Sequence, residues 1–265
     1  MERRTLVFFH AHPDDESIAT GGTMIKAADA GHRVVLVVGT RGENGEVEEG
    51  FLGPDEPLWQ RRVQETHAAA AVLGARRVEF LDYVDSGMIG TPENEHPESF
   101  WQADVEEAAR RLADILVEER ADVLSIYDEN GVYGHPDHIQ VHRVGARAGE
   151  LAGTARVFMS TVDKDRMMRL MKEASESGDL ELPGDLDAEE FELGVPAERI
   201  TTRIDVTDVC DRKRRAMAAH ASQISETSFF LAMKSEHFQA AFGEEAYIFC
   251  GPPDGAPADG LLEGL

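Results

Sequence analysis

Cysteine and basic residues are both scarce in this sequence, and each shortage excludes a class of protein. Only two cysteines occur among 265 residues, Cys210 and Cys250, and they form no CxxC pair. We therefore expect neither a disulfide scaffold nor a thiolate zinc site. Lysine and arginine together number 26 against 51 aspartate and glutamate residues, for a formal net charge of -25. Because this charge would repel a phosphate backbone or an anionic bilayer, neither nucleic acid nor membrane is expected as a partner.

Long apolar runs are missing as well. The opening Met-Glu-Arg-Arg is followed by only five residues of strand-like character, too few for the apolar region of a signal peptide. No other run approaches the length of a membrane span. Together with the isolated cysteines, these features predict a cytoplasmic protein.

Short apolar runs alternate with helical patterns through the first half of the chain. Runs rich in Val, Leu and Phe, typical of strands buried on both faces, lie at residues 5–9, 33–38, 77–81 and 122–127. Helical spacing appears at residues 17–30, 58–73 and 102–120. Gly31 and Gly74 stand where helix C-caps belong. The alternation predicts an α/β fold, a Rossmann-like, doubly wound and mostly parallel sheet.

The pattern weakens after about residue 150. Residues 173–199 are acidic, interrupted by Gly and Pro, and predicted to be an exposed, mobile excursion. Helical character returns at 207–221 and 229–242, and a last short strand is expected at 246–250. These elements predict an added C-terminal α/β portion, in which the apolar run at 229–231 belongs to the core.

We predict a single domain. Its parts are a core at residues 1–162, the excursion, and the C-terminal portion at 200–250, followed by a flexible tail at 251–265. Two loops in the core, at 39–57 and 83–99, are unusually long. Because ligands bind at the carboxyl ends of the strands in such sheets, both loops are expected to shape a site.

The first predicted strand leads into a dense group of metal-binding side chains. His12, Asp14, Asp15 and Glu16 place one imidazole and three carboxylates within five residues. Such a density of charge is costly without a cation, and imidazole with carboxylate is an ordinary ligand set for catalytic zinc. His12 and Asp15 can point to one centre across the turn that Pro13 imposes, with Asp14 beside the metal.

A second group with the same composition follows the strand expected at residues 122–127. It runs from 127 to 138 and ends in His-Pro-Asp-His at residues 135–138. The strands at 5–9 and 122–127 can lie side by side in a doubly wound sheet, which would bring the two groups together. Three protein ligands would then leave a fourth position for water, as a catalytic zinc requires.

The two motifs resemble those of the LmbE-like, or PIG-L, zinc-dependent N-acetylglucosaminyl deacetylases. AHPDDE at residues 11–16 and HPDH at residues 135–138 carry the resemblance, which spans roughly residues 4–250. It implies a hydrolase that removes an N-acetyl group from a small N-acetylglucosaminyl-type substrate. The nearest patterns are the mycothiol-pathway deacetylase and the mycothiol-conjugate amidase, and Thr20, where the amidases carry lysine, favours a deacetylase.

The resemblance also implies roles for individual residues. The zinc ligands would be His12, Asp15 and His138, with Asp14 as the general base and His135 as a cationic or proton-donating partner. Substrate contacts are implied for Glu46, Arg62 and His220. From the mechanism we further expect Tyr133 or His135 to stabilise the oxyanion and Asp137 to orient an imidazole. Fe²⁺ or Co²⁺ could occupy the same ligands as Zn²⁺.

Several of these residues also have a structural interpretation. The alternatives are a hydrogen-bonded strand-end histidine for His10, a helix N-terminal acid for Glu16, a turn or cap residue for Asp137, a solvated helix face for His142, and a core or capping histidine for His220. Two other functions stay open, an amidase or esterase on a larger conjugate and a non-catalytic sugar-binding protein with a structural metal. A homo-oligomer is also left open.

Overall fold

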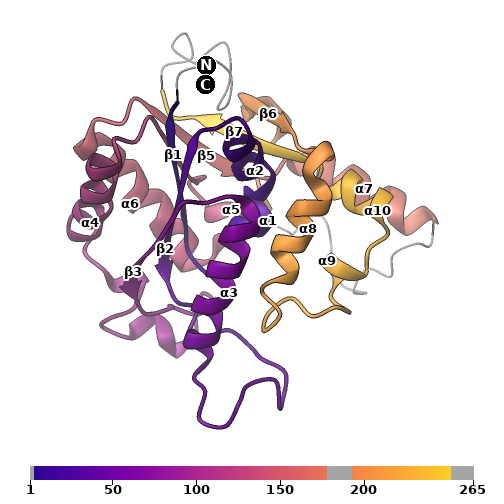
Figure 1. Ribbon diagram of the computed structural model, residues 1–265, viewed down its shortest axis with the longest axis horizontal. Coiled ribbons are helices and arrows are strands. Elements are labelled where there is room, and N and C mark those ends of the chain that lie inside the picture. Colours follow the sequence, from indigo (N-terminus) through magenta and orange to yellow (C-terminus); the bar gives the residue numbers. More distant parts are fainter. Residues whose placement is uncertain (1–2, 178–192, 252–265) are drawn as a thin grey trace.

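One twisted sheet runs through the computed structural model, which describes residues 3–177 and 193–251 (Figure 1). Its strands are β1 (Thr5–His10), β2 (Arg33–Thr40), β3 (Arg77–Tyr83), β4 (Val123–Tyr127), β5 (Arg156–Thr161), β6 (Thr202–Asp205) and β7 (Glu244–Phe249). Their order across the sheet is β3-β2-β1-β4-β5-β7-β6. The first five are parallel, and β7 runs antiparallel to both β5 and β6. The predicted α/β class with a mostly parallel sheet is confirmed.

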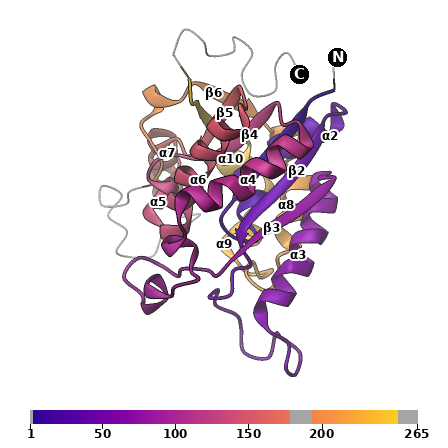
Figure 2. The same ribbon diagram turned by 90° about the vertical axis from the view of Figure 1, so that its left-hand side faces the viewer.

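Helices cover both faces of the sheet. They are α1 (Asp15–Ala19), α2 (Gly21–Asp29), α3 (Leu58–Leu73), α4 (Val105–Glu119), α5 (Gly131–Gly134), α6 (Pro136–Ala152), α7 (Lys164–Ser177), α8 (Cys210–Ala218), α9 (Phe229–Ala232) and α10 (Ser235–Phe242). Figure 2 shows α4 and α6 on one side of the sheet, with α3 and α8 on the other. The helices α7, α9 and α10 gather at one end, on the right of Figure 1.

The alternation of side chains along β1 explains the two layers. Val7 and Phe9 join the core cluster beneath α4 and α6, whereas Leu6 and Phe8 join the cluster beneath α2 and α3. All four side chains are fully buried. A strand whose successive residues face opposite sides of a sheet is apolar throughout only when both faces are covered. The short apolar runs were therefore a sound signal for the parallel strands.

The helix predicted at residues 17–30 is interrupted. It forms two helices, α1 and α2, because Thr20 between them takes a non-helical conformation (φ -132°, ψ 7°). The Thr20 hydroxyl contacts the ring of His10 at 2.9 Å. The α2 helix packs so closely on the C-terminal portion that a Cβ at Gly22 would overlap Val206. Gly74, at the end of α3, is the predicted C-cap, with a φ of 85°.

The part of the chain after about residue 150 departs furthest from expectation. Strands β5 and β6 and helix α7 were not predicted, and α7 occupies the start of the segment predicted as an excursion. The rest of that prediction at 178–192, and the tail at 252–265, lie outside the described residues. The predicted division into core, excursion and C-terminal portion stays a prediction.

The core assignment of residues 229–231 was wrong for its first member. Phe229 is 54% exposed, whereas Phe230 and Leu231 pack against a small cluster formed by α8 and α10. The reason is the shortness of α9, which turns only part of its apolar run inward. Within residues 3–177 and 193–251, no helix has both the length and the apolar character needed to cross a bilayer.

Candidate metal centre and active site

The two sequence motifs meet where the strand order reverses. Strands β1 and β4 are parallel neighbours, with Leu6 opposite Val123 and Phe8 opposite Ser125. Their carboxyl ends, at His10 and Tyr127, therefore open onto the same edge of the sheet. This is the topological switch point, where ligands bind in doubly wound sheets.

Imidazoles from both motifs surround one carboxylate. Asp15 Oδ2 lies 3.6 Å from His12 Nδ1 and 3.4 Å from His138 Nε2. His12, His135 and His138 each bring one ring nitrogen within 4.8 Å of the others. Ligands held at about 2.0–2.2 Å by a tetrahedral cation are about 3.3–3.6 Å apart, so these separations suit a shared metal ion. The structure thus brings together the three residues predicted as ligands, and His135 with them.

The second ring nitrogen of His12 is held by a carboxylate. His12 Nε2 lies 3.0 Å from Asp137 Oδ2, and the Asp137 side chain is fully buried. The Ser86 backbone N–H donates to the same Asp137 oxygen at 2.9 Å, and the Ser86 hydroxyl donates to the other. Metal-binding histidines commonly donate their other N–H to a carboxylate, which fixes the ring. This geometry leaves His12 Nδ1 free to face Asp15.

Asp85 is a functional candidate that sequence reasoning missed. Its Oδ1 lies 3.6 Å from His12 Nε2, and its carboxylate accepts from the backbone N–H groups of Asn44 and Gly87. His12, Asp85 and Asp137 form a second group of ligand atoms within 4.8 Å of one another. The sequence singled out the loop at 83–99 but no residue within it. A single acid in an acidic loop looks like a solvated side chain.

Burial and charge pull the pKa values of this cluster in opposite directions. Burial lowers the pKa of His12, but the carboxylates of Asp85, Asp137 and Asp15 outweigh it and raise that pKa well above its ordinary value. Burial raises the pKa of Asp15, and the facing His138 and His12 rings reverse this and hold it well below its usual range. Three carboxylates thus converge on the His12 ring, and a bound divalent cation would neutralise part of their charge.

The residues present fit a divalent metal. Imidazole nitrogens and carboxylate oxygens converge without thiolate, a donor set suited to zinc and to other first-row metals. Among the described residues, His138 Nδ1 is buried without a hydrogen-bond partner, and His138 Nε2 has only a 3.3 Å contact with Tyr133 and the contact with Asp15. Buried imidazoles are normally better satisfied than this.

Asp14 projects beside the cluster from a strained backbone. Its φ of 106° is rare for any residue but glycine. Glu16 stabilises this strained conformation, because its Oε2 accepts the Asp14 backbone N–H at 3.0 Å. Burial raises the pKa of Asp14 to about 6, against the opposing charge of Arg62. A carboxylate with this pKa is ionised at neutral pH and more basic than an exposed aspartate, as a general base requires.

His220 reaches this site only through Glu16. The two side chains are fully buried, and His220 Nε2 lies 2.6 Å from Glu16 Oε1. Burial would lower the pKa of His220, but the Glu16 carboxylate outweighs it and raises it. His220 thus lies behind the carboxylate that holds the Asp14 backbone.

Arg62 ties a long loop to the first motif. Its guanidinium donates to the carbonyl oxygens of Gly42 at 2.9 Å and Pro13 at 2.6 Å, and the side chain is buried. The loop can approach it because Gly42 has a φ of 65° and no Cβ, which would overlap the guanidinium. Glu46 is exposed in the same loop, and its carbonyl accepts from the Gln223 amide at 3.0 Å.

The surroundings of His135 favour a neutral imidazole. Burial, followed by the neighbouring His12 and His138, lowers the pKa of His135 to about 4. Its Nδ1 accepts the Asp137 backbone N–H at 3.1 Å, which caps α6. The ring proton therefore resides on Nε2. An imidazole with its proton on Nε2 can serve as the proton-donating partner that the family resemblance implies.

Tyr133 lies within the second motif, on a turn whose backbone is strained. The preceding Val132 has a φ of 70°, an outlier for a β-branched residue. Asp128 holds this turn, because its Oδ1 accepts the backbone N–H groups of Asn130 at 3.0 Å and Val132 at 2.9 Å. Asp128 is almost fully buried. It is a second supporting carboxylate that the sequence did not distinguish from its acidic neighbours.

The two histidines next to the motifs, His10 and His142, are hydrogen-bonded to the scaffold. His10 contacts the Tyr127 hydroxyl at 2.7 Å and Thr20 at 2.9 Å, and burial lowers its pKa to about 4. Tyr127 in turn stacks on the His138 ring, with ring centroids 4.7 Å apart. His142 Nδ1 contacts the Tyr127 carbonyl at 3.0 Å. His10 is therefore a satisfied histidine that steadies the ring against which His138 packs.

A cluster of possible metal ligands, a buried carboxylate and an imidazole N–H at a switch point are the parts that a metal-assisted hydrolase requires. The comparisons agree. The PIG-L family model, described as GlcNAc-PI de-N-acetylase, matches residues 7–149. A 1D-myo-inositol 2-acetamido-2-deoxy-alpha-D-glucopyranoside deacetylase of Acidothermus cellulolyticus is 43% identical over 257 residues, which cover 92% of this chain and 88% of that protein. The chain belongs to the PIG-L family, and it is a deacetylase.

Solved structures share the fold at low identity. The N,N'-diacetylchitobiose deacetylase of Pyrococcus horikoshii matches with a TM-score of 0.58 and 22% identity, over 94% of this chain and 84% of that one. The 4-carboxy-2-hydroxymuconate hydratase GalB of Pseudomonas putida matches equally well, with a TM-score of 0.60 and 18% identity, over 94% and 97% of the two chains. Because GalB is named as a hydratase, the fold alone does not decide the chemistry.

Proposed function

We propose that this protein removes the acetyl group from the amide nitrogen of a glucosaminyl-inositol, with zinc as its metal. The single observation that carries the proposal is the position of Asp14, a basic carboxylate adjoining the cluster of His12, Asp15 and His138. The names of the relatives support the substrate, and the donor set supports zinc, with Fe²⁺ or Co²⁺ as alternatives.

The metal ligands proposed are His12 Nδ1, Asp15 and His138 Nε2, with Asp137 holding the far side of the His12 ring. A divalent cation bound there would polarise the acyl carbonyl and make a water molecule more acidic. Asp85 is not proposed as a ligand, because it faces the nitrogen of His12 that Asp137 already occupies.

Asp14 accepts the proton of the attacking water, since its pKa of about 6 leaves it ionised but basic at neutral pH. His135, through its Nε2–H, and the hydroxyl of Tyr133 donate hydrogen bonds to the carbonyl oxygen as it gains negative charge. Asp14 then returns the proton to the leaving nitrogen. The amide and one water become acetate and a free amine.

The sugar is proposed to lie on the side of the cluster formed by Asp85, Arg62 and the loop at 39–57. Arg62 shapes that side by holding Pro13 and Gly42, and Glu46 is exposed where sugar hydroxyls would need acceptors. His220 acts indirectly, because it pairs with Glu16, and Glu16 holds the Asp14 backbone. The isolated cysteines support the further proposal of a cytoplasmic protein. The acidic composition supports a small-molecule partner, with neither nucleic acid nor membrane bound.

The test is a hydrolysis assay on purified protein whose metal content has been measured. N-acetylglucosaminyl-inositol, N-acetylglucosamine and an O-acetyl sugar are supplied to metal-loaded and chelator-treated samples, and amine and acetate release are both followed. We expect one amine for each acetate, fastest on the inositol conjugate and lost on chelation. Hydrolysis of the ester alone, or amide hydrolysis that is unaffected by chelation, would refute the proposal.

A further inference from the structure

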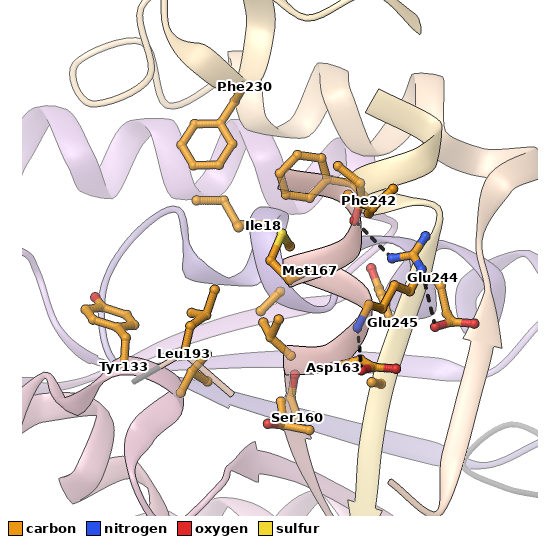
Figure 3. Close-up of a pocket in the computed structure, with 18 of the residues that line it drawn as sticks. Ile18, Tyr133, Ser160, Asp163, Met167, Leu193, Phe230, Phe242, Glu244 and Glu245 are labelled. Carbon is orange, nitrogen blue, oxygen red and sulfur yellow. Dashed lines mark hydrogen bonds and ion pairs between the residues drawn. The ribbon is translucent and has the colours of Figure 1, made fainter. Parts of the chain in front are cut away.

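An apolar pocket that an acetyl group does not need adjoins the catalytic residues. Its volume is about 930 Å³. It lies among α1, α7, α9, α10 and the adjoining ends of β5 and β7. Figure 3 shows Ile18, Met167 and Phe230 along its middle, between Tyr133 at one end and Glu244 at the other. A cavity of this size accommodates a drug-sized ligand, far more than the methyl group of acetate.

The walls of the pocket are suited to a hydrocarbon. Apolar side chains from four helices line it, including Ile18, Met167, Leu170, Phe230 and Phe242, together with Met233 just after α9. Methionine and phenylalanine side chains adapt to flexible apolar ligands. Two of the acidic side chains that reach the pocket are already neutralised, Glu245 by Lys213 at 2.6 Å and Asp163 by Arg203 at 2.7 Å.

The pocket lies on one side of the catalytic centre only. Asp14, Asp15, Tyr133 and His138 form part of its lining, whereas Arg62, Glu46 and Asp85 do not. An amide carbonyl at the centre has the sugar nitrogen on one side and the acyl carbon chain on the other. With the sugar on the side of Arg62, the acyl chain points into the apolar pocket.

We infer that this pocket binds the acyl group of the substrate, and that the enzyme hydrolyses amides of straight-chain apolar acids longer than acetic acid. The inference rests on the proposed function, because it uses the same catalytic centre and the same side for the sugar. The reaction is unchanged in balance, since one amide and one water give one carboxylate and one free amine.

The effect is measured over a series of N-acyl glucosamines with acetyl, butyryl, hexanoyl and octanoyl groups. Each methylene that leaves water for an apolar pocket is expected to raise kcat/KM about fourfold, the factor that corresponds to its transfer free energy. Each step of two carbons should therefore bring about a 16-fold increase until the pocket is filled.

Two variants block the pocket from different elements. Ala241→Phe fills it from α10, and Met167→Trp fills it from α7 if the first variant folds poorly. Ala232→Phe on α9 is the matched control, because Ala232 is exposed and does not line the pocket. Both blocking variants should abolish the gain with chain length while leaving hydrolysis of N-acetylglucosamine unchanged, and the control should retain the gain.

A binding measurement separates the pocket from the chemistry. In metal-free protein, titration calorimetry should detect tighter binding of N-octanoylglucosamine than of N-acetylglucosamine, and Ala241→Phe should remove the difference. A kcat/KM that falls as the acyl chain lengthens beyond acetyl, or a gain that survives both blocking variants, overturns the inference and leaves the deacetylase function standing. Inactivity of metal-loaded protein on every substrate overturns both.

Discussion

The two sides of the catalytic centre are built in different ways. On the side of Arg62 and Asp85, long loops are held by hydrogen bonds between buried polar side chains and backbone, such as Arg62 with Gly42 and Asp85 with Gly87. On the opposite side, helices of the C-terminal portion present apolar side chains to a pocket. The polar side can orient a group with fixed hydrogen-bonding geometry, whereas the apolar side selects by volume and hydrophobicity.

Buried carboxylates anchor the C-terminal portion to the first part of the chain. Glu245 on β7 accepts the backbone N–H groups of Gly22 and Thr23 at the start of α2, each at 2.8 Å, and pairs with Lys213 at 2.6 Å. Both charged side chains are almost fully buried. The apolar wall is therefore fixed to the helix that follows the first motif. Under the two proposals, catalysis depends on the residues of the two motifs, and acyl preference on the attached C-terminal portion.

The largest effect is expected from Asp15→Ala, because Asp15 lies between the two proposed histidine ligands. Metal content should fall to background and hydrolysis with it, for acetyl and longer acyl substrates alike. Elemental analysis and amine release measure the two quantities. Asp114→Ala, at an exposed position on α4, is the control and should change neither. A variant that kept its metal would remove Asp15 from the ligand set.

His135→Ala should have the next largest effect. The variant loses the Nε2–H proposed to face the developing oxyanion, and removal of one such donor typically costs about 100- to 1000-fold in kcat. Metal content and the preference for longer acyl chains should be retained, since His135 is not among the pocket residues. The exposed His67→Ala provides a control. An equal loss of bound metal would show that His135 is a ligand.

His220→Leu should act through Glu16 and not through substrate contact. It leaves the Glu16 carboxylate buried without its partner, which is expected to cost about 3–5 kcal/mol in the free energy of unfolding. The Asp14 backbone should also lose its support, lowering kcat about 10- to 100-fold with little change in KM. His220→Gln retains an N–H donor and should recover much of both. A change confined to KM would instead indicate direct contact with substrate.

The smallest effect is expected at Glu119, which lies on α4 and far from the catalytic centre. Arg33, followed by Arg77, lowers the pKa of Glu119 to about 2 despite partial burial. A depressed carboxyl pKa stabilises the fold above the pKa of the unfolded chain and ceases to do so as pH falls through the folded value. Glu119→Gln should therefore cost about 1 kcal/mol at neutral pH.

The cost should disappear between about pH 4.5 and pH 2, the interval from the ordinary glutamate pKa to the folded one. Denaturant unfolding of the wild type and the variant across this range measures it. A difference that grew on acidification would show that the two arginines do not stabilise the ionised carboxylate.

The same comparison explains what the sequence could predict. Strands β1 to β4 were readable because burial on both faces requires an unbroken apolar run, and the metal-binding side chains stood in two short motifs. Strand β6, Thr-Arg-Ile-Asp, is polar at three of four positions because it lies at the sheet edge, so no local pattern marked it. The apolar pocket is assembled from α1, α7, α9 and α10, which only the folded chain brings together.

Supporting carboxylates were missed for a related reason. Asp85 and Asp128 occur in acidic loops, where sequence alone favours a solvated side chain. Their roles depend on backbone N–H groups that converge on them in space. The resemblance supplied Glu46, Arg62 and His220 as substrate contacts, and the structure adds what it could not, that Arg62 and His220 are buried against the first motif.

The central claim is that Asp14 accepts a proton while other residues hold the metal, and Asp14→Asn tests it most directly. The purified variant is analysed for bound metal and for amine release from N-acetylglucosaminyl-inositol on the same preparation. We predict a metal content equal to that of the wild type and a kcat lower by about 10²- to 10⁴-fold. Loss of metal together with activity, or full activity with metal bound, would contradict the account.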